Sequence, residues 1–128
     1  ASRSAIEAAQ DILRAADTIN RELGGAIPQP LRIGVGVHCG HTVLARIGDA
    51  EQGYSMSVIG QTVVIASRLE EATKELAADC IVSEETIADA GLKSAKAGTM
   101  HTLNFRTGEA PVPVRAFADA DDVKALVG

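Results

Sequence analysis

The sequence predicts a fold of the α+β class, with an α/β sandwich as the alternative, in one domain of 128 residues. Two long stretches, residues 4–23 and 61–78, have apolar residues at the spacing of amphipathic helices. Short alternating or apolar runs typical of strands lie between these stretches and after them. The predicted order is therefore helix, strands, helix, strand, short helix and a closing hairpin.

The first part of the chain is predicted to form one helix and three strands. The apolar stripe of the helix consists of Ile6, Ala9, Leu13 and Ala16, widened by Ile12, Ile19 and Leu23. Residues 31–38 alternate strictly and form a strand whose Gly34 and Gly36 share one face, which favours close approach by a helix or a ligand. The next two strands are residues 43–48 and 56–59, with residues 49–55 as a loop.

The second part begins with the helix at residues 61–78, whose apolar face consists of Ile65, Leu69, Ala72 and Leu76. Ser83 is predicted to cap a brief helix that ends at Gly91. The remaining elements are strands at residues 80–82, 99–106 and 112–118, and a helical tail at residues 119–128.

Composition excludes several classes of function. A formal charge of −5 without a basic run makes the chain a poor binder of duplex nucleic acid. With no Trp, one Tyr and two Phe, it also lacks the aromatic platforms on which single-stranded bases stack.

Cys39 and Cys80, without a CxxC motif, favour a reducing compartment, and we expect a cytoplasmic protein. No apolar run approaches the roughly 20 residues that span a bilayer. Because the chain starts inside a helical pattern without Met, we expect a piece of a longer protein, and tethering to an upstream membrane or sensor module stays open.

Five sequence blocks follow one another in a distinctive order: RIGVGVHCG (32–40), TVLARIG (42–48), YSMSVIGQTVVIASRLE (54–70), CIVSEET (80–86) and APVPVRAF (110–117). Each block alone is weakly specific, but together they cover nearly all of the chain after the first helix. In this order they resemble the catalytic domain of the class III nucleotidyl cyclases, which make cyclic nucleotides from nucleoside triphosphates. The resemblance implies a ferredoxin-like α/β sandwich, of which residues 1–128 would be an incomplete C-terminal portion lacking the N-terminal strands.

The resemblance also implies cofactors and partners. The first half of such a domain holds two Asp residues that bind two Mg²⁺ or Mn²⁺ ions, so both ions would be held by residues outside this chain. Active sites of the family lie at a head-to-tail dimer interface, which implies a homodimer or a complementing cyclase half. The implied substrate is a nucleoside triphosphate, with ATP favoured over GTP. Missing strands would leave an open sheet edge, so we expect the isolated chain to dimerise or aggregate.

The resemblance assigns roles to two residues of the helix at 61–78. Arg68, one turn after Val64, matches the family arginine that stabilises charge on the α-phosphate, a role that suits a fixed guanidinium. The alternative is a surface arginine that pairs with Glu71 or Glu75. Val64 stands where the family usually has an Asn that hydrogen-bonds the ribose. Valine cannot do this, and we interpret Val64 as a buried helix residue.

Four further residues match nucleotide-binding positions. Ser57 falls where the family places its base-selecting residue, and a hydroxyl there can accept from the adenine amino group, with an ordinary strand serine as the alternative. Val58 and Ile59 match positions whose backbone faces the purine, with plain core packing as the alternative. Gly108 lies near the family's Lys or Arg that grips the terminal phosphates. Arg106 is the nearby substitute, with an exposed strand residue as the alternative.

Two other motifs are interpreted as structural. His38, Cys39 and His41 lie too close together on a strand and its turn to converge on zinc without other ligands. The glycines of this region lie within a strand rather than at a strand-to-helix turn, so they do not form a dinucleotide-binding fingerprint. We therefore assign no metal ligand in this chain.

These observations predict the C-terminal part of an adenylate cyclase domain. In the intact dimer the 3′-hydroxyl of ATP would attack the α-phosphate, giving cyclic AMP and pyrophosphate, and this part alone would be inactive. Two alternatives stay open. One is a degenerate cyclase-like domain that dimerises, regulates or binds nucleotide without turnover. The other is an unrelated α/β scaffold, in which the helix at 61–78 would not follow a strand ending at Gly60.

Overall fold

The computed structural model describes residues 1–49, 51–106, 108 and 110–128, and the side chains of these residues except those of 43–47 and 54–59. Its helices are α1 (Ser2–Leu23), α2 (Gln61–Glu75), α3 (Glu84–Asp89) and α4 (Ala120–Val127). Its strands are β1 (Val35–Val37), β2 (Val43–Asp49), β3 (Gly53–Ile59), β4 (Cys80–Ser83), β5 (Thr99–Leu103) and β6 (Val112–Phe117).

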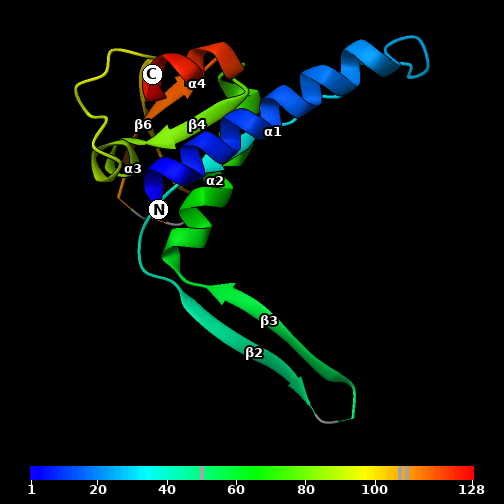
Figure 1. The fold of residues 1–128 in the computed structure, drawn as a ribbon. Coiled ribbons are helices and arrows are strands. Elements are labelled where there is room, and N and C mark those ends of the chain that lie inside the picture. Colours follow the sequence, from blue (N-terminus) through cyan, green and yellow to red (C-terminus); the bar gives the residue numbers. More distant parts are fainter. Residues whose placement is uncertain (50, 107, 109) are drawn as a thin grey trace.

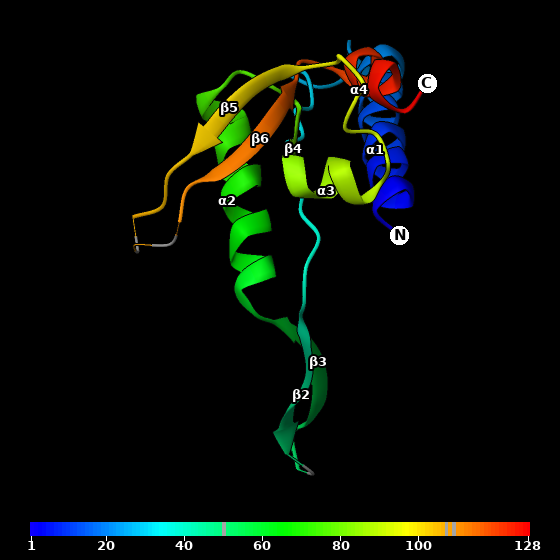
Figure 2. The same ribbon diagram turned by 90° about the vertical axis from the view of Figure 1, so that its left-hand side faces the viewer.

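A mixed sheet with the strand order β1-β4-β6-β5 forms the centre of the fold. Strand β1 runs parallel to β4, and the other neighbours are antiparallel. Helix α2 covers one face of the sheet, whereas α1, α3 and α4 lie on the other (Figure 2). This arrangement confirms the predicted α+β class.

The sheet separates two hydrophobic cores, because successive side chains of a strand point to opposite faces. In β4, Cys80 and Val82 face α1, whereas Ile81 faces α2. The core on the α1 side consists of Ile6, Ala9, Leu13, Cys80, Val82, Ile87, Ala97, Phe117, Ala120, Val123 and Leu126. The core on the α2 side consists of Leu69, Ala72, Ala78, Ile81, Leu103, Val114 and Ala116. Full burial of a side chain such as Leu69 contributes about 1.5–3 kcal/mol.

The glycine face of the first strand packs against α2, as one of the two predicted possibilities. A Cβ added at Gly36 would lie 2.6 Å from the backbone nitrogen of Glu70 and 2.7 Å from the carbonyl oxygen of Ala66. A Cβ at Gly34 would meet the side chain of Thr73. The absence of these Cβ atoms therefore lets α2 lie directly on β1 and fixes the height of that helix above the sheet.

Strands β2 and β3 form an antiparallel hairpin that projects away from the rest of the molecule (Figure 1). The pairing extends from Val43 opposite Ile59 to Asp49 opposite Gly53, so the predicted loop at 49–55 is mostly strand. The Asp49 carboxylate accepts hydrogen bonds from the backbone nitrogens of Glu51 (3.1 Å) and Gln52 (2.7 Å). These two local hydrogen bonds stabilise the end of the hairpin, which the sequence pattern did not predict.

Three elements are shorter in the structure than the sequence predicted. Strand β1 is limited to Val35–Val37, because Leu31 instead exchanges two backbone hydrogen bonds with the side chain of Asn20 (2.6 and 2.8 Å). Strand β5 ends at Leu103 rather than at residue 106, and α2 ends at Glu75 rather than at residue 78. Ala77 follows with φ 51, a left-handed conformation that a helix cannot contain.

The wide apolar stripe predicted for α1 was partly wrong. Its narrow stripe is buried, but Ile12, Ile19 and Leu23 are 45%, 39% and 48% exposed. The C-terminal end of α1 extends beyond the sheet (Figure 1). Among the described residues, no helix is both long and apolar enough to cross a membrane.

Candidate functional site

A pocket of about 580 Å³ lies between the outer face of α2 and the segment that follows β5. It is lined by Val63, Val64, Ser67, Arg68, Glu71, Glu75, Asn104, Phe105 and Arg106. Three of the predicted site residues therefore share one pocket: Val64, Arg68 and Arg106. A cavity of equal volume lies between α1 and residues 29–33, on a different part of the surface.

Helical spacing explains why α2 contributes most of the lining. Val64, Arg68, Glu71 and Glu75 follow one another at three or four residues and so form a single stripe along the helix. The apolar stripe with Leu69 and Ala72 is turned toward the sheet instead. The close packing at Gly36 thus holds α2 with its charged stripe facing outward, next to Asn104.

Arg68 is held at both ends of its guanidinium group. Its Nε donates to the carbonyl oxygen of Asn104 at 3.2 Å. Its Nη1 and Nη2 donate to the carboxylate of Glu75 at 3.2 to 3.3 Å. The side chain is 23% exposed, so it is ordered by these contacts yet open to the pocket. The predicted alternative, an ion pair with Glu75, is thus present at the same position as the predicted site.

The pocket has charges of both signs and an apolar wall. Arg68 and the exposed Arg106 provide two positive groups, and Glu71 and Glu75 provide two negative ones. Phe105 is half-buried beside them. Arginine presents planar, always charged donors that match phosphate oxygens, so this set can bind an anion once a carboxylate gives way.

Val64 differs from its predicted interpretation. It is 50% exposed and lines the pocket, so the view that it is a plain buried helix residue was wrong. It lies one turn before Arg68 on the same stripe, where a polar side chain would also reach the pocket. Its side chain offers no hydrogen-bonding group at that point.

Ser57, Val58 and Ile59 lie on β3, paired with Ala45, Leu44 and Val43 of β2. Their side chains are outside the described part of the structure, so their assigned roles remain predictions. Strand β3 leads through Gly60 directly into α2, which is not what the unrelated-scaffold alternative predicts. Gly60 has φ 143 and ψ 169, a conformation that only glycine adopts readily.

His38 and Cys39 have structural contacts with the start of α3. The Nδ1 atom of His38 lies 2.8 Å from Oγ of Ser83, whose side chain caps α3. The backbone nitrogen of Cys39 donates to Oγ1 of Thr86 at 2.8 Å. Burial lowers the pKa of His38, and the negative charge of Glu85 opposes that shift. The predicted helix cap at Ser83 is confirmed.

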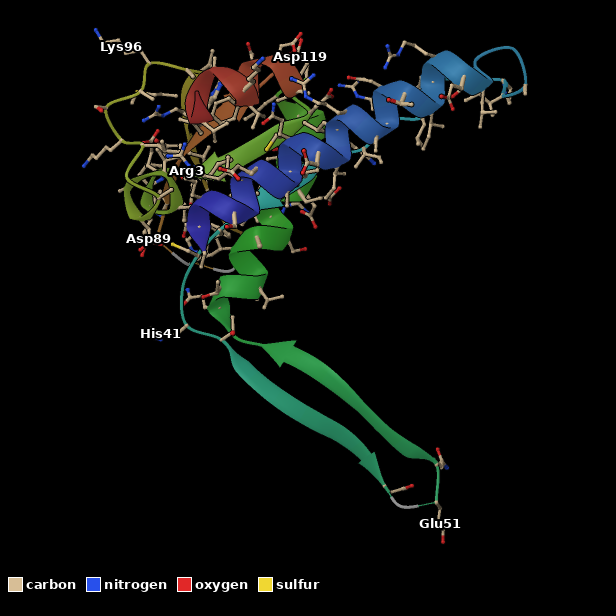
Figure 3. All side chains as sticks on the ribbon, in the orientation of Figure 1. Arg3, His41, Glu51, Asp89, Lys96 and Asp119 are labelled. Atoms are coloured by element: carbon tan, nitrogen blue, oxygen red, sulfur yellow. The ribbon has the colours of Figure 1, made fainter. Side chains whose placement is uncertain are left out.

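The described residues do not fit the two-metal centre that the resemblance implies. Among them, no three His, Cys, Asp or Glu side chains are close enough together to hold a metal ion. His41 lies at the base of the hairpin, away from Asp89 (Figure 3). No catalytic step through a metal is therefore assigned to these residues.

Sequence reasoning missed one wall of the pocket. Asn104 and Phe105 were assigned to a continuing strand, whereas the chain leaves the sheet after Leu103 and turns toward α2. The sequence signal that was available is Asn104 itself, because asparagine is depleted in strands and common in turns.

Known proteins resemble this chain in sequence and in fold. The family model described as the adenylate and guanylate cyclase catalytic domain matches residues 2–107. A search of curated proteins found no match. The structure resembles the crystal structure of the guanylyl cyclase Cya2, with a TM-score of 0.76 and 22% identity over 92% of this chain. It also resembles a bacterial light-regulated adenylyl cyclase, with a TM-score of 0.67 and 19% identity over 98% of this chain.

At these identities the two structural likenesses establish the fold alone. The chain spans 58% of the length of the first of these proteins and 38% of the second. The family assignment rests on the family model, whose match covers most of the chain, including α2 and Arg68. This protein therefore belongs to the family of adenylate and guanylate cyclase catalytic domains.

Proposed function

We propose that this chain forms part of a cyclase active site that converts ATP to cyclic AMP and pyrophosphate, with Arg68 as its main catalytic residue. The observation that supports this most directly is the placement of Arg68. Its guanidinium is anchored through Nε to the Asn104 carbonyl and opens into the pocket that also contains Arg106. That arrangement suits the stabilisation of charge on phosphate oxygens.

In the proposed reaction the 3′-hydroxyl oxygen of ATP forms a bond to the α-phosphorus, and the bond from that phosphorus to the bridging oxygen breaks. Pyrophosphate leaves, and the hydroxyl proton passes to solvent or a base outside the described residues. Negative charge builds on the α-phosphate oxygens, where the fork of Arg68 would donate two hydrogen bonds. Arg106 would contact the leaving phosphates.

The proposal includes a second contribution from outside this chain. The described residues do not hold the two Mg²⁺ or Mn²⁺ ions that the family uses, so the ligands would come from another segment or subunit. A homodimer or a complementing cyclase half would supply them. Ser57 is proposed to select adenine, which makes ATP the favoured substrate over GTP.

The test is product formation by the full-length protein with Mn²⁺ and either ATP or GTP. We expect cyclic AMP, and we expect Arg68→Ala to lower kcat by about 10²–10³-fold, as for loss of a donor to a transition-state oxyanion. Arg21→Ala is the matched control, because Arg21 is an exposed arginine whose side chain bonds only locally to Thr18. Cyclic GMP as the main product would overturn the adenine assignment, and an equal effect of both variants would overturn the role of Arg68.

One observation favours a second candidate function, a degenerate domain that binds nucleotide without turnover. Val64 opens into the pocket but offers no hydrogen bond to a ribose. In full-length protein, Val64→Asn should restore product formation if this candidate is right and the parent is inactive. Activity in the parent itself would reject the degenerate domain.

A further inference from the structure

We propose that Glu75 is a positioning residue that holds Arg68 in the pocket as a stand-in for phosphate, and that the phosphate of the nucleotide displaces it. The inference rests on the proposed function, because it concerns how Arg68 is kept ready for its ligand. It adds a residue and a regulatory contact to that site.

The first argument is which donors Glu75 occupies. An arginine has five N–H groups, one on Nε and two on each Nη. The Nε–H group donates to the Asn104 carbonyl, whereas the Glu75 carboxylate accepts hydrogen bonds from both Nη1 and Nη2. A guanidinium can bind a phosphate in a bidentate manner through its Nη1/Nη2 edge or its Nε/Nη edge, and with Nε occupied by Asn104 the Nη1/Nη2 edge remains. Glu75 and a phosphate would therefore compete for the same atoms, while the Asn104 contact stays in place.

The second argument is that the exchange costs little. The side chain of Glu75 is 57% exposed, against 23% for Arg68, so its carboxylate can move into water without losing hydration. Exposed ion pairs of this kind contribute little to stability. Three hydrogen-bond distances of 3.2 to 3.3 Å are also longer than those of strong charge-assisted bonds.

The third argument is the location of Glu75 on its helix. It is the last residue of α2, where the helix dipole presents partial negative charge. A carboxylate is unfavourable at that end, and the pair with Arg68 offsets the repulsion. Among the described residues, Arg68 is the hydrogen-bonding partner of the Glu75 carboxylate, so this contact favours the orientation of that side chain toward the pocket.

Glu71 provides a matched comparison. It lies on the same stripe of α2, one turn before Glu75, and lines the same pocket. Its side chain is exposed, and its carboxylate makes no hydrogen bond to Arg68 in the described part of the chain. Neutralising Glu71 thus reports the general effect of removing one negative charge from the pocket.

The experiment measures binding of inorganic tripolyphosphate to the full-length protein by titration calorimetry at low salt. Compared with the parent, Glu75→Gln should bind more tightly by up to about fivefold, the largest change that removal of an exposed ion pair allows. Glu71→Gln should gain less. In an Arg68→Gln background the gain from Glu75→Gln should vanish, because the competition needs both partners.

Kinetics give a second readout if the parent is active. Glu75→Gln should lower KM for ATP with kcat unchanged, since Glu75 has left Arg68 once the phosphate is bound. Equal gains for Glu75→Gln and Glu71→Gln, or a gain that persists in the Arg68→Gln background, would overturn this inference alone. Unchanged tripolyphosphate binding in Arg68→Gln would instead overturn the proposed function of Arg68, and this inference with it.

Discussion

The molecule contains two arginine–glutamate pairs of similar chemistry in opposite surroundings. Arg115 of β6 pairs with Glu84 at the start of α3, through bonds of 2.6 and 3.0 Å, and the two side chains are 4% and 18% exposed. Arg68 pairs with Glu75 at 3.2 to 3.3 Å, and those side chains are 23% and 57% exposed. The two arginine–glutamate pairs therefore differ in how deeply they are buried and not in the type of partner.

The remaining donors show what the difference means. Arg115 also donates to the carbonyl oxygens of Lys93 (3.2 Å), Ala95 (2.6 Å) and Ala97 (3.5 Å), so its guanidinium is fully used in fastening the segment after α3. Arg68 contacts one carbonyl and a carboxylate that water also reaches. A buried guanidinium whose N–H groups are all hydrogen-bonded maintains structure. A guanidinium that is held by one carbonyl and stays accessible can bind a ligand.

The largest expected effect is on stability. Arg115→Ala should lower the free energy of unfolding by about 3–5 kcal/mol, because it leaves Glu84 half-buried and three carbonyls without their donor. Arg68→Ala should cost less than about 1 kcal/mol, as for an exposed pair. Urea denaturation followed by circular dichroism measures both. Equal losses of unfolding free energy would show that the two pairs contribute alike to stability. Arg115→Lys, which cannot reach the same partners, serves as an intermediate control.

The next effect concerns the helix that carries Arg68. Gly36→Ala should cost about 1–3 kcal/mol or more, since the added Cβ would meet the backbone of Glu70 and Ala66, which cannot rotate away. Gly25→Ala is the control, because a Cβ there meets nothing within 4 Å. Thermal unfolding of both variants is the measurement. A neutral Gly36→Ala would show that α2 is not fixed by β1, and the position of α2 above the sheet would then need another cause.

A smaller effect concerns the contact between His38 and Ser83, which lies outside both arginine pairs. The pKa of His38 is lowered from its usual 6.5 by burial, with Glu85 opposing. The unfolded chain therefore takes up a proton before the folded one does. The His38 contribution to stability is present above pH 6.5 and is lost as the pH falls through the folded value.

Urea midpoints at pH 7.5 and 5.5 test this sign. The parent should lose stability at the lower pH, and His38→Asn, which retains a polar group facing Ser83 but does not titrate, should lose less. A larger loss in His38→Asn than in the parent would assign the pH dependence to other groups.

The smallest effect is that of salt. The stability difference between the parent and Arg68→Ala should shrink by a few tenths of a kcal/mol between low salt and 1 M NaCl, where screening acts over about 3 Å. The corresponding difference for Arg115→Ala should stay constant, because a buried pair is poorly screened. Equal salt dependence would mean that water reaches both pairs alike.

The sequence predicted the α+β class, the helix that bears Arg68 and a close approach to Gly36, by a helix or by a ligand, because these depend on local periodicity and on a residue without a side chain. It did not predict the pairing of Arg115 with Glu84, which are 31 residues apart and meet only once β6 lies beside β4. The exposure of Val64 was missed for a similar reason. Helical spacing gives the faces of α2, but only the folded sheet decides which face is covered.

The hairpin of β2 and β3 is joined to the body at two points, residues 41–42 and Gly60, and a side-chain hydrogen bond ties the first of them to α2. Oγ1 of Thr62 donates to the carbonyl oxygen of His41 at 2.7 Å. Seven-residue strands are roughly 23 Å long, so a rotation of about 10° at this base would move the far end of the hairpin by about 4 Å. The hairpin therefore acts as a mechanical lever, and the hydroxyl of Thr62 holds the base of that lever against α2.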